Sequence, residues 1–230
     1  MKGKLLSFLA LGIFIFLLSM PILAQEETNN EESESPFTVT ADIVSNYIWR
    51  GSKLSPGPSI QPTLDFTKGG FSIGAWGSAD FASGYAEVDP YLTYAFPFGL
   101  ALTINDYYNS DLDFSNFSDT LGSHAVELSA AFEIKGFSLG ANYIVNEAGG
   151  IGSEGGDMYF EAGYTFKNFN VFAGAGNGWY TTDSEFKFCN IGLGATKELT
   201  ITDKFKLPLF GQVIYNPDQK LFYLVFGLTL

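Results

Sequence analysis

Cysteine, histidine and arginine are nearly missing from this chain of 230 residues, which contains one of each: Cys189, His124 and Arg50. A single cysteine excludes an internal disulfide, and with only one histidine beside it no set of Cys and His ligands is available for a metal. We therefore expect no metal site and no cofactor. Basic residues are scarce too, with 12 Lys and Arg against 25 Asp and Glu and a net charge of −13. A protein this acidic lacks the basic patches that bind nucleic acid.

Long apolar runs are also missing, except at the N-terminus. Lys2 and Lys4 lead into the almost wholly apolar stretch Leu5–Leu18, which is followed by a short segment ending at Ala24. This order predicts a secretory signal peptide over residues 1–24, cleaved after Ala24. The alternative is a transmembrane anchor, which the short run disfavours because a spanning helix needs about 20 apolar residues. Residues 25–36 are acidic and polar without apolar spacing, which predicts a disordered periplasmic leader.

The remaining residues, 37–230, alternate between apolar and polar side chains. In the first stretch Val39, Ala41 and Ile43 take one parity, whereas Thr40 and Asp42 take the other. Successive side chains of a strand point to opposite faces, so the pattern predicts a strand with one apolar and one polar face. Its recurrence predicts about twelve strands: Phe37–Trp49, Ser59–Thr67, Phe71–Ala79, Ala86–Phe96, Leu100–Tyr108, Ser123–Ile134, Phe137–Asn146, Asp157–Phe166, Phe169–Gly176, Phe188–Glu198, Leu207–Asn216 and Leu221–Leu230.

Long and short connections alternate between most of these strands, although the last two connections break the rule. Bacterial outer-membrane barrels have long outer loops, short periplasmic turns and aromatic girdles, and aromatic residues make up 17% of this chain. The apolar strand faces carry almost no charge, and only a closed barrel can present such faces to lipid. The fold class predicted is therefore all-β: a transmembrane, antiparallel, up-and-down β-barrel of the bacterial outer membrane. A secreted soluble β-sandwich is the alternative, because its strands alternate as well.

Three short elements near the start of the barrel resemble a family of bacterial outer-membrane proteins. The family elements are Ser-Asp/Asn-Tyr-x-Trp/Phe-Arg-Gly, then Pro-Ala-x-Gln, then Gly-Phe/Leu-x-x-Gly-x-Trp-Gly-Ser. They correspond here to Ser45–Gly51, to Pro58–Gln61 with Ser59 in place of Ala, and to Gly70–Ser78. The chain thus resembles the TorF-like porins, also described as Gcw-type conserved hypothetical proteins. The resemblance implies an outer-membrane barrel, and it implies a channel only by analogy of fold.

Charged residues on the polar strand faces are the candidates for a functional site. In the predicted register Arg50 ends the polar face of the first strand, with no lysine at any inward mid-strand position. It would pair with inward carboxylates, because an unpaired charge in a confined lumen is costly. One interpretation is a packing network that holds the first strand to its neighbours. The other is a charged constriction that selects solutes, with these lumen candidates: Asp42, Asn46, Arg50, Asp65, Glu87, Asp89, Glu127 and Glu161.

Two functions of different classes follow. The first is a porin-like channel for small cationic or neutral solutes, favoured by the excess of inward acids. The second is a non-conducting barrel whose loops, above all Asn109–Gly122, bind a surface ligand or partner. Inward glycines would either open a pore or make room for large rings such as Trp76, Tyr159, Phe172 and Phe210.

Catalysis is poorly supported, and we expect the protein not to be an enzyme. A membrane-barrel phospholipase needs a serine two residues after its histidine, on the same strand face; here Val126 holds that position after His124. Cys189 has no base at readable spacing and is expected to act as a small apolar residue. The expected partners are outer-membrane lipid and lipopolysaccharide, small solutes, and the barrel-assembly machinery through the C-terminal strand that ends at Leu230.

Overall fold

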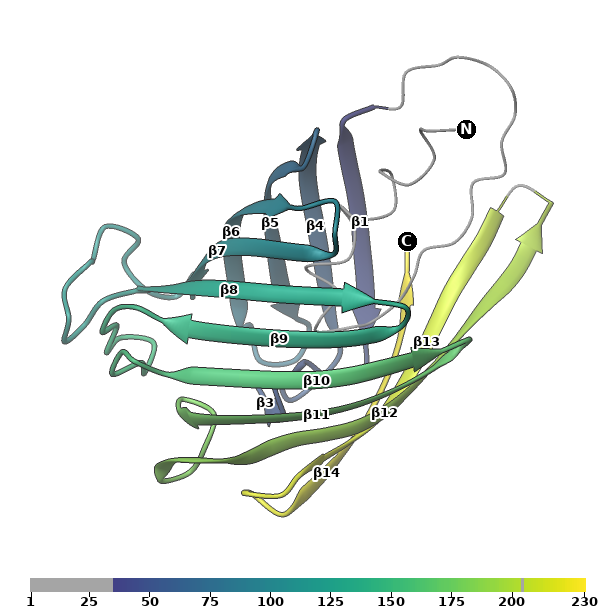
Figure 1. The fold of residues 1–230 in the computed structure, drawn as a ribbon. Helices are drawn as coiled ribbons and strands as arrows, with labels where there is room; N and C mark the ends of the chain where they lie inside the picture. Colours follow the sequence, from purple (N-terminus) through teal and green to yellow (C-terminus); the bar gives the residue numbers. More distant parts are fainter. Residues whose placement is uncertain (1–34, 204) are drawn as a thin grey trace.

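The computed structural model describes residues 35–203 and 205–230, and the strands in these ranges close into a barrel (Figure 1). The predicted signal peptide and nearly all of the predicted leader lie outside the described residues. Twelve strands form the wall in the order β1-β14-β13-β12-β11-β10-β9-β8-β7-β6-β5-β4, with β1 paired to β4. Every pair is antiparallel, as predicted. No helix within the described residues is long and apolar enough to cross a membrane.

The strand boundaries follow the alternating pattern closely. The predicted strand Leu100–Tyr108 coincides with β7, and most others differ by one or two residues. The strands are β1 Phe37–Val44, β2 Ile48–Trp49, β3 Ser52–Lys53, β4 Ser59–Lys68, β5 Phe71–Asp80, β6 Ala86–Ala95, β7 Leu100–Tyr108, β8 His124–Ile134, β9 Phe137–Ile144, β10 Met158–Phe166, β11 Phe169–Gly178, β12 Ser184–Thr202, β13 Phe205–Asn216 and β14 Leu221–Thr229.

Three predicted boundaries were wrong by more than two residues. The first strand ends at Val44 rather than Trp49, and the segment after it forms the separate two-stranded hairpin β2–β3. Strand β12 begins at Ser184 rather than Phe188, and it continues to Thr202, well past the predicted end at Glu198, because its polar and apolar residues still alternate there. The connection from β12 to β13 is therefore a tight turn. Long loops lie at one end of the barrel and tight turns at the other, except that the connection from Asn216 to Leu221 is short although it lies at the loop end. Figure 1 shows the long loops at the left ends of β8 and β9 and the tight turn between these strands at their right ends.

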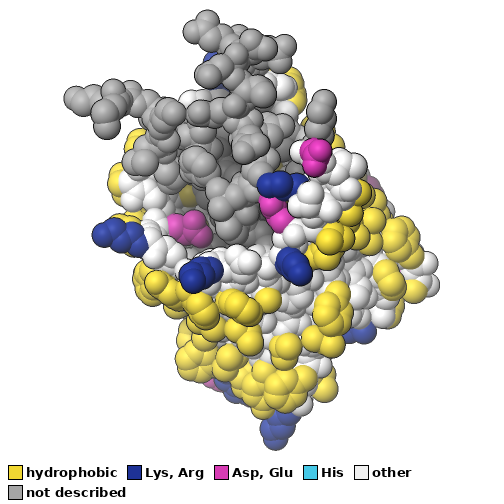
Figure 2. Space-filling view, turned by 90° about the vertical axis from the view of Figure 1, so that its right-hand side faces the viewer, with side chains coloured by type: hydrophobic (Ala, Val, Ile, Leu, Met, Phe, Trp, Pro, Cys, Tyr) yellow, Lys and Arg dark blue, Asp and Glu magenta, His cyan; other side chains and the backbone are white. Residues whose placement is uncertain are grey.

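Polar residues lie inside the barrel and apolar residues outside. Along β6, Glu87 and Asp89 are 7% and 2% exposed, whereas Val88 and Leu92 are each 45% exposed. A soluble β-sandwich would bury its apolar faces, so this observation excludes that alternative for the described residues. Figure 2 looks onto the end with the tight turns and shows hydrophobic side chains over the outer wall, with charged side chains at the rim.

Glycines on the inner face make room for aromatic rings from neighbouring strands. A Cβ at Gly174 would lie 2.0 Å from the Tyr159 hydroxyl, and one at Gly192 would lie 2.1 Å from the Phe172 ring. A Cβ at Gly227 would lie 2.1 Å from the Phe210 ring. Such ring-over-glycine packing is a known device of β-barrels. Of the two roles considered for these inward glycines, the structure shows ring accommodation at these positions.

Candidate functional site

The loop between β1 and β4 folds into the barrel as a hairpin, which we call the plug hairpin, residues 45–58. Its strands β2 and β3 are joined by the two residues Arg50 and Gly51, with φ of 47° and 86°. Positive φ at both central residues is the type I′ geometry of the tightest hairpins. Arg50 thus sits at the tip of a turn, not at the end of the first strand where the sequence placed it.

The tip of the hairpin contacts two separate parts of the wall. Gly51 lies against β12, the third strand from β1 around the barrel, where a bulge at Cys189 exposes the Cys189 carbonyl: a Cβ on Gly51 would be 1.9 Å from that oxygen. From β13, Asn216 Nδ2 donates a 2.9 Å hydrogen bond to the Gly51 carbonyl oxygen. Arg50 reaches Glu127 on β8, the fifth strand from β1 in the other direction, so the tip extends across the lumen.

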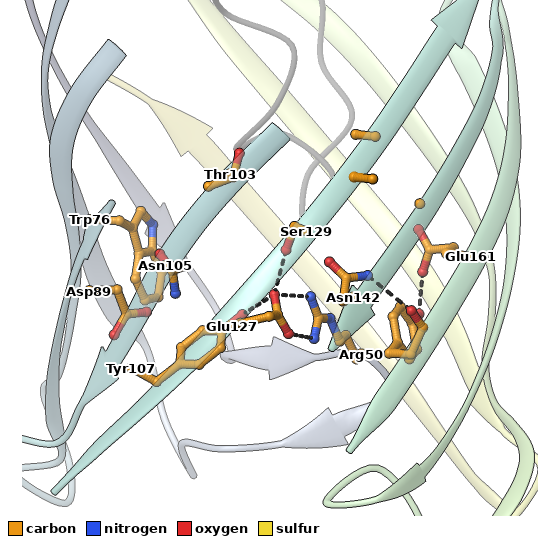
Figure 3. Close-up of a pocket in the computed structure, with 14 residues that line it drawn as sticks. Arg50, Trp76, Asp89, Thr103, Asn105, Tyr107, Glu127, Ser129, Asn142 and Glu161 are labelled. Carbon is orange, nitrogen blue, oxygen red and sulfur yellow. Dashed lines mark hydrogen bonds and ion pairs between the residues drawn. The ribbon is translucent and has the colours of Figure 1, made fainter. Parts of the chain in front are cut away.

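Arg50 and Glu127 form a two-pronged ion pair inside the barrel, drawn in Figure 3. Arg50 Nη1 lies 2.5 Å from Glu127 Oε2, and Nη2 lies 2.9 Å from Oε1. The side chains are only 10% and 2% exposed. Tyr107 and Ser129 also donate to Oε1, at 3.0 and 2.9 Å. The Tyr180 hydroxyl accepts from Nη1 at 2.7 Å. Both carboxylate oxygens are therefore fully partnered.

Aromatic rings surround the guanidinium group. The Arg50 Cζ atom lies 5.0 Å from the centre of Trp49, 4.7 Å from that of Tyr159 and 5.3 Å from that of Tyr180. These distances are in the cation–π range, and such contacts strengthen when desolvated. Trp49 also packs on Tyr107 at 5.2 Å. The ion pair and its rings form a buried cluster inside the barrel.

Because Arg50 and Glu127 are both buried, loss of either side chain should lower the stability of the protein. Desolvation offsets much of the attraction in a buried pair, but removing one partner leaves an uncompensated charge at a cost of about 3–5 kcal/mol. The Arg50–Glu127 ion pair therefore stabilises the plug hairpin only while both charges are present, and the buried position becomes strongly unfavourable for the remaining charge when one is lost.

A cavity of about 80 Å³ lies beside the pair. It extends from Arg50 and Glu127 past Ser129, which lies further along β8 towards the tight turn. Its lining combines the carboxyl groups of Asp89, Glu127 and Glu161 with aromatic and small side chains, and it contains no lysine. The residues lining it are Arg50, Trp76, Asp89, Thr103, Asn105, Tyr107, Glu127, Ser129, Ala130, Ala131, Gly140, Asn142, Tyr159 and Glu161.

The predicted lumen residues fall into three groups. Arg50, Asp89, Glu127 and Glu161 line the cavity together. Glu87 and Asp65 are also buried on the inner face, where Glu87 accepts from the Tyr85 hydroxyl at 2.9 Å and Asp65 from the Tyr91 hydroxyl at 3.0 Å.

Asp42 and Asn46 make up the third group, at the seam between the first and last strands. Asp42 accepts from the Thr229 hydroxyl at 2.6 Å, and Asn46 donates to the Leu224 carbonyl oxygen at 3.1 Å. Both residues link the chain to β14 and do not line the cavity.

A second inner network adjoins the first. The Tyr159 hydroxyl donates to Glu161 Oε2, which also accepts from Asn190 Nδ2 at 3.0 Å. Sequence reasoning missed the partners Tyr107, Tyr180 and Asn190. Tyr107 and Asn190 could have been found as inward polar positions, but Tyr180 lies in a loop between β11 and β12, where alternation gives no signal.

His124 orders the longest loop rather than lying idle at the rim. Its Nδ1 lies 2.8 Å from Asp106 Oδ2 and its Nε2 lies 2.8 Å from the Phe114 carbonyl oxygen. The ring is stacked between Tyr108 and Phe117, with centres 5.0 and 4.4 Å away. The imidazole thus ties residues 109–122 to the barrel rim. In the same loop, hydrogen bonds from the Ser115 backbone and hydroxyl lower the pKa of Asp113.

Replacing the imidazole by a ring without nitrogens should loosen this loop. In His124→Phe the stacking remains, but both hydrogen bonds are lost, and each is worth about 1 kcal/mol or more when buried. We expect chymotrypsin to cut the folded barrel after Phe114 or Phe117 about tenfold faster than it cuts the unchanged protein. Equal cleavage rates would contradict the anchoring role. Ser110→Ala, in the same loop but away from the ring, is the control.

Metal binding has no support in this region. Among the residues that the structure describes, no three His, Cys, Asp or Glu side chains are grouped so that they could hold a metal ion.

Residues 30–205 match the model of a family described as bacterial proteins of unknown function, Gcw_chp. The chain belongs to this family. The match to the Gcw_chp family includes the plug hairpin and the walls of the cavity. No curated protein matches the chain.

Among solved structures, the Gcw_chp chain is similar to mutant forms of the Rh. blastica porin. One comparison has 12% identity over 86% of this chain and 74% of the porin, with a TM-score of 0.43. Another has 12% identity over 75% of this chain, with a TM-score of 0.40. In the latter the chain spans 55% of the porin's length, little more than half. These values are too low to carry an argument about this protein.

Proposed function

We propose that the protein is an outer-membrane barrel whose lumen is a gated passage for small cationic or neutral solutes, closed here by the plug hairpin. The observation that carries the proposal is the single, fully partnered Arg50–Glu127 pair at the tip of a hairpin that crosses the lumen. If the side chains of the barrel wall filled the lumen by themselves, no hairpin would have to enter it. The ion pair acts together with the packing of the Trp49 ring and the Asn216 hydrogen bond, and a hairpin held at its tip by side-chain contacts of this kind is an element that can be released.

The outer-membrane part of the proposal is supported by the apolar exterior. Large side chains face outwards from every side of the barrel, among them Val39 at 73% exposed, Ile73 at 59% and Phe222 at 71%. Continuous apolar surfaces of this extent mark membrane or partner contacts. The test is separation of membranes by density after expression with the native leader. Recovery in the inner membrane or the soluble fraction would contradict this location.

The preference for cations is supported by the charges inside. Glu87, Asp89, Glu127 and Glu161 are buried, and no lysine among the described residues is buried. Arg50 alone opposes them, and it is already paired. Rings of carboxylates favour cations in pores. The TorF-like porin name suggested by the sequence motifs agrees with this proposal.

A liposome-swelling assay tests the passage. The unchanged barrel should admit small solutes slowly, whereas a variant with residues 46–57 replaced by a short Gly-Ser linker should admit them at least tenfold faster. Small amines should enter faster than carboxylic acids of the same size. If the shortened variant is folded and still impermeable, the lumen is not a passage.

The non-conducting barrel remains a second candidate because of one loop. The His124-anchored loop presents Phe114, Phe117 and Leu121 with 64%, 71% and 67% exposure. Apolar side chains held out by an ordered loop suit contact with a surface ligand. An impermeable shortened variant would favour this candidate.

A further inference from the structure

Asn105 is a buried amide without a partner. Its side chain points into the cavity from β7, the residue is only 5% exposed, and neither its Oδ1 nor its Nδ2 makes a hydrogen bond with the described residues. A buried polar group normally has a partner, and one that lacks it costs about 1–3 kcal/mol. The amide therefore marks a place where the cavity is built to receive a polar group.

The surroundings of Asn105 are acidic. Asp89, 2% exposed, lines the same cavity from β6; its Oδ1 accepts the Tyr108 backbone N–H at a long 3.3 Å, and its carboxyl group hydrogen-bonds to that of Glu87. Glu87 lies two residues before it on the same face of β6 and is also buried. No cation of the described residues pairs with either carboxylate, since Arg50 is bound to Glu127. Figure 3 shows Asp89 and Asn105 on one side of the cavity and the ion pair beside them.

The indole of Trp76 completes this side. Trp76 is directly opposite Asp89 in the β5–β6 ladder and lines the cavity. An aromatic face next to a carboxylate and an amide oxygen suits an ammonium group, which donates three hydrogen bonds and is attracted by the ring. A Ca²⁺ or Mg²⁺ ion fits poorly, because these ions take six or more oxygen ligands.

We propose that Asp89, Asn105 and Trp76 form a subsite for the primary ammonium group of a small amine. The ammonium group donates to Asp89 and to Asn105 Oδ1, while Asn105 Nδ2 donates to an acceptor on the same solute. The cavity volume of about 80 Å³ limits the solute to a few heavy atoms. The subsite specifies which class of solute the proposed passage would carry, and its physiological role rests on that proposed function.

Ethanolamine is a suitable probe because it carries an ammonium group and a hydroxyl acceptor. The experiment is calorimetric titration of the refolded full barrel in detergent micelles with ethanolamine hydrochloride, with ethylene glycol as a neutral probe of similar size. We expect saturable binding of ethanolamine, at least tenfold weaker binding in Asp89→Asn and in Asn105→Leu, and no binding of ethylene glycol. Asp119→Asn removes the same charge in an exposed loop and should bind normally.

Each other result overturns the subsite. Absent binding, equal binding by Asn105→Leu, or equal binding of ethylene glycol would each show that no ammonium site exists. Circular dichroism and heat-modifiable migration on gels confirm that each variant is folded. The binding assay does not depend on conduction: the barrel can bind ethanolamine and never conduct, or conduct without binding it. Failure of the subsite and failure of the passage are thus distinguishable.

Discussion

Glu127→Gln should release the plug hairpin and open the barrel. The change keeps the size of the side chain but leaves the Arg50 guanidinium buried without a counter-charge, which costs about 3 kcal/mol or more. The hairpin can relieve this cost by withdrawing Arg50 towards solvent. We expect frequent, cation-selective openings in planar bilayers and a loss of about 3 kcal/mol in the free energy of unfolding measured in urea with lipid vesicles.

Two further variants isolate the ion pair. Glu161→Gln also removes a buried carboxylate charge that lines the cavity, but Glu161 is bound by Tyr159 and Asn190 and not by Arg50. It should leave the barrel closed. The double substitution of Arg50 and Glu127 by methionine removes both charges and should recover much of the lost stability, since apolar replacements of a buried pair are often tolerated. Frequent openings in Glu161→Gln and none in Glu127→Gln would contradict the role of the pair.

Gly51→Ala should have a similar effect without changing any charge. Gly51 has a φ of 86°, where alanine is strained, and the new Cβ would lie 1.9 Å from the Cys189 carbonyl oxygen. Backbone on both sides leaves no flexible group to yield. Strain and overpacking of this kind each cost about 1–3 kcal/mol. The tip should leave the bulge at Cys189, and single-channel openings should appear.

Gly84→Ala is the matched control for the backbone strain that alanine suffers at a positive φ. Gly84 has a φ of 79°, and a Cβ there would meet nothing within 4 Å. The strain of a positive φ is therefore similar in the two variants, and only Gly51→Ala adds a clash with the backbone of β12. If both variants behave alike, the contact between the tip and β12 is not what keeps the hairpin in the lumen.

Much of the fold was predictable because each strand of the barrel has one face towards the lumen and one towards the outside, and the sequence alternates between polar and apolar residues accordingly. The strand Leu100–Tyr108 and the turn after Ile134 follow from side-chain parity and from Lys135 and Gly136, which have positive φ. A strand has only two faces, so parity alone assigns each of its residues to lipid or lumen. The C-terminal end of β12 was missed because the weakly polar run Leu199–Thr202 looked like a connection.

The site was predictable only in part. The sequence named Arg50 and Glu127 as inward charges, but it could not pair them, because the two residues are 77 positions apart and one lies on a hairpin. The alternation of polar and apolar residues says nothing about side-chain direction where the chain is not part of a barrel strand, as is the case after Val44. Tyr180 was out of reach for the same reason. The element Ser45–Gly51 that suggested the family turns out to contain the plug hairpin's first arm and its tip.

Single-channel recording in a salt gradient shows whether the plug hairpin closes the lumen, when the refolded barrel is compared with the variant in which residues 46–57 are replaced by a short linker. We expect the unchanged barrel to be closed most of the time and the shortened barrel to conduct steadily, with a reversal potential of cation-selective sign. A shortened barrel that is folded and silent, or an unchanged barrel that conducts as well as the shortened one, would show that the hairpin does not gate a passage.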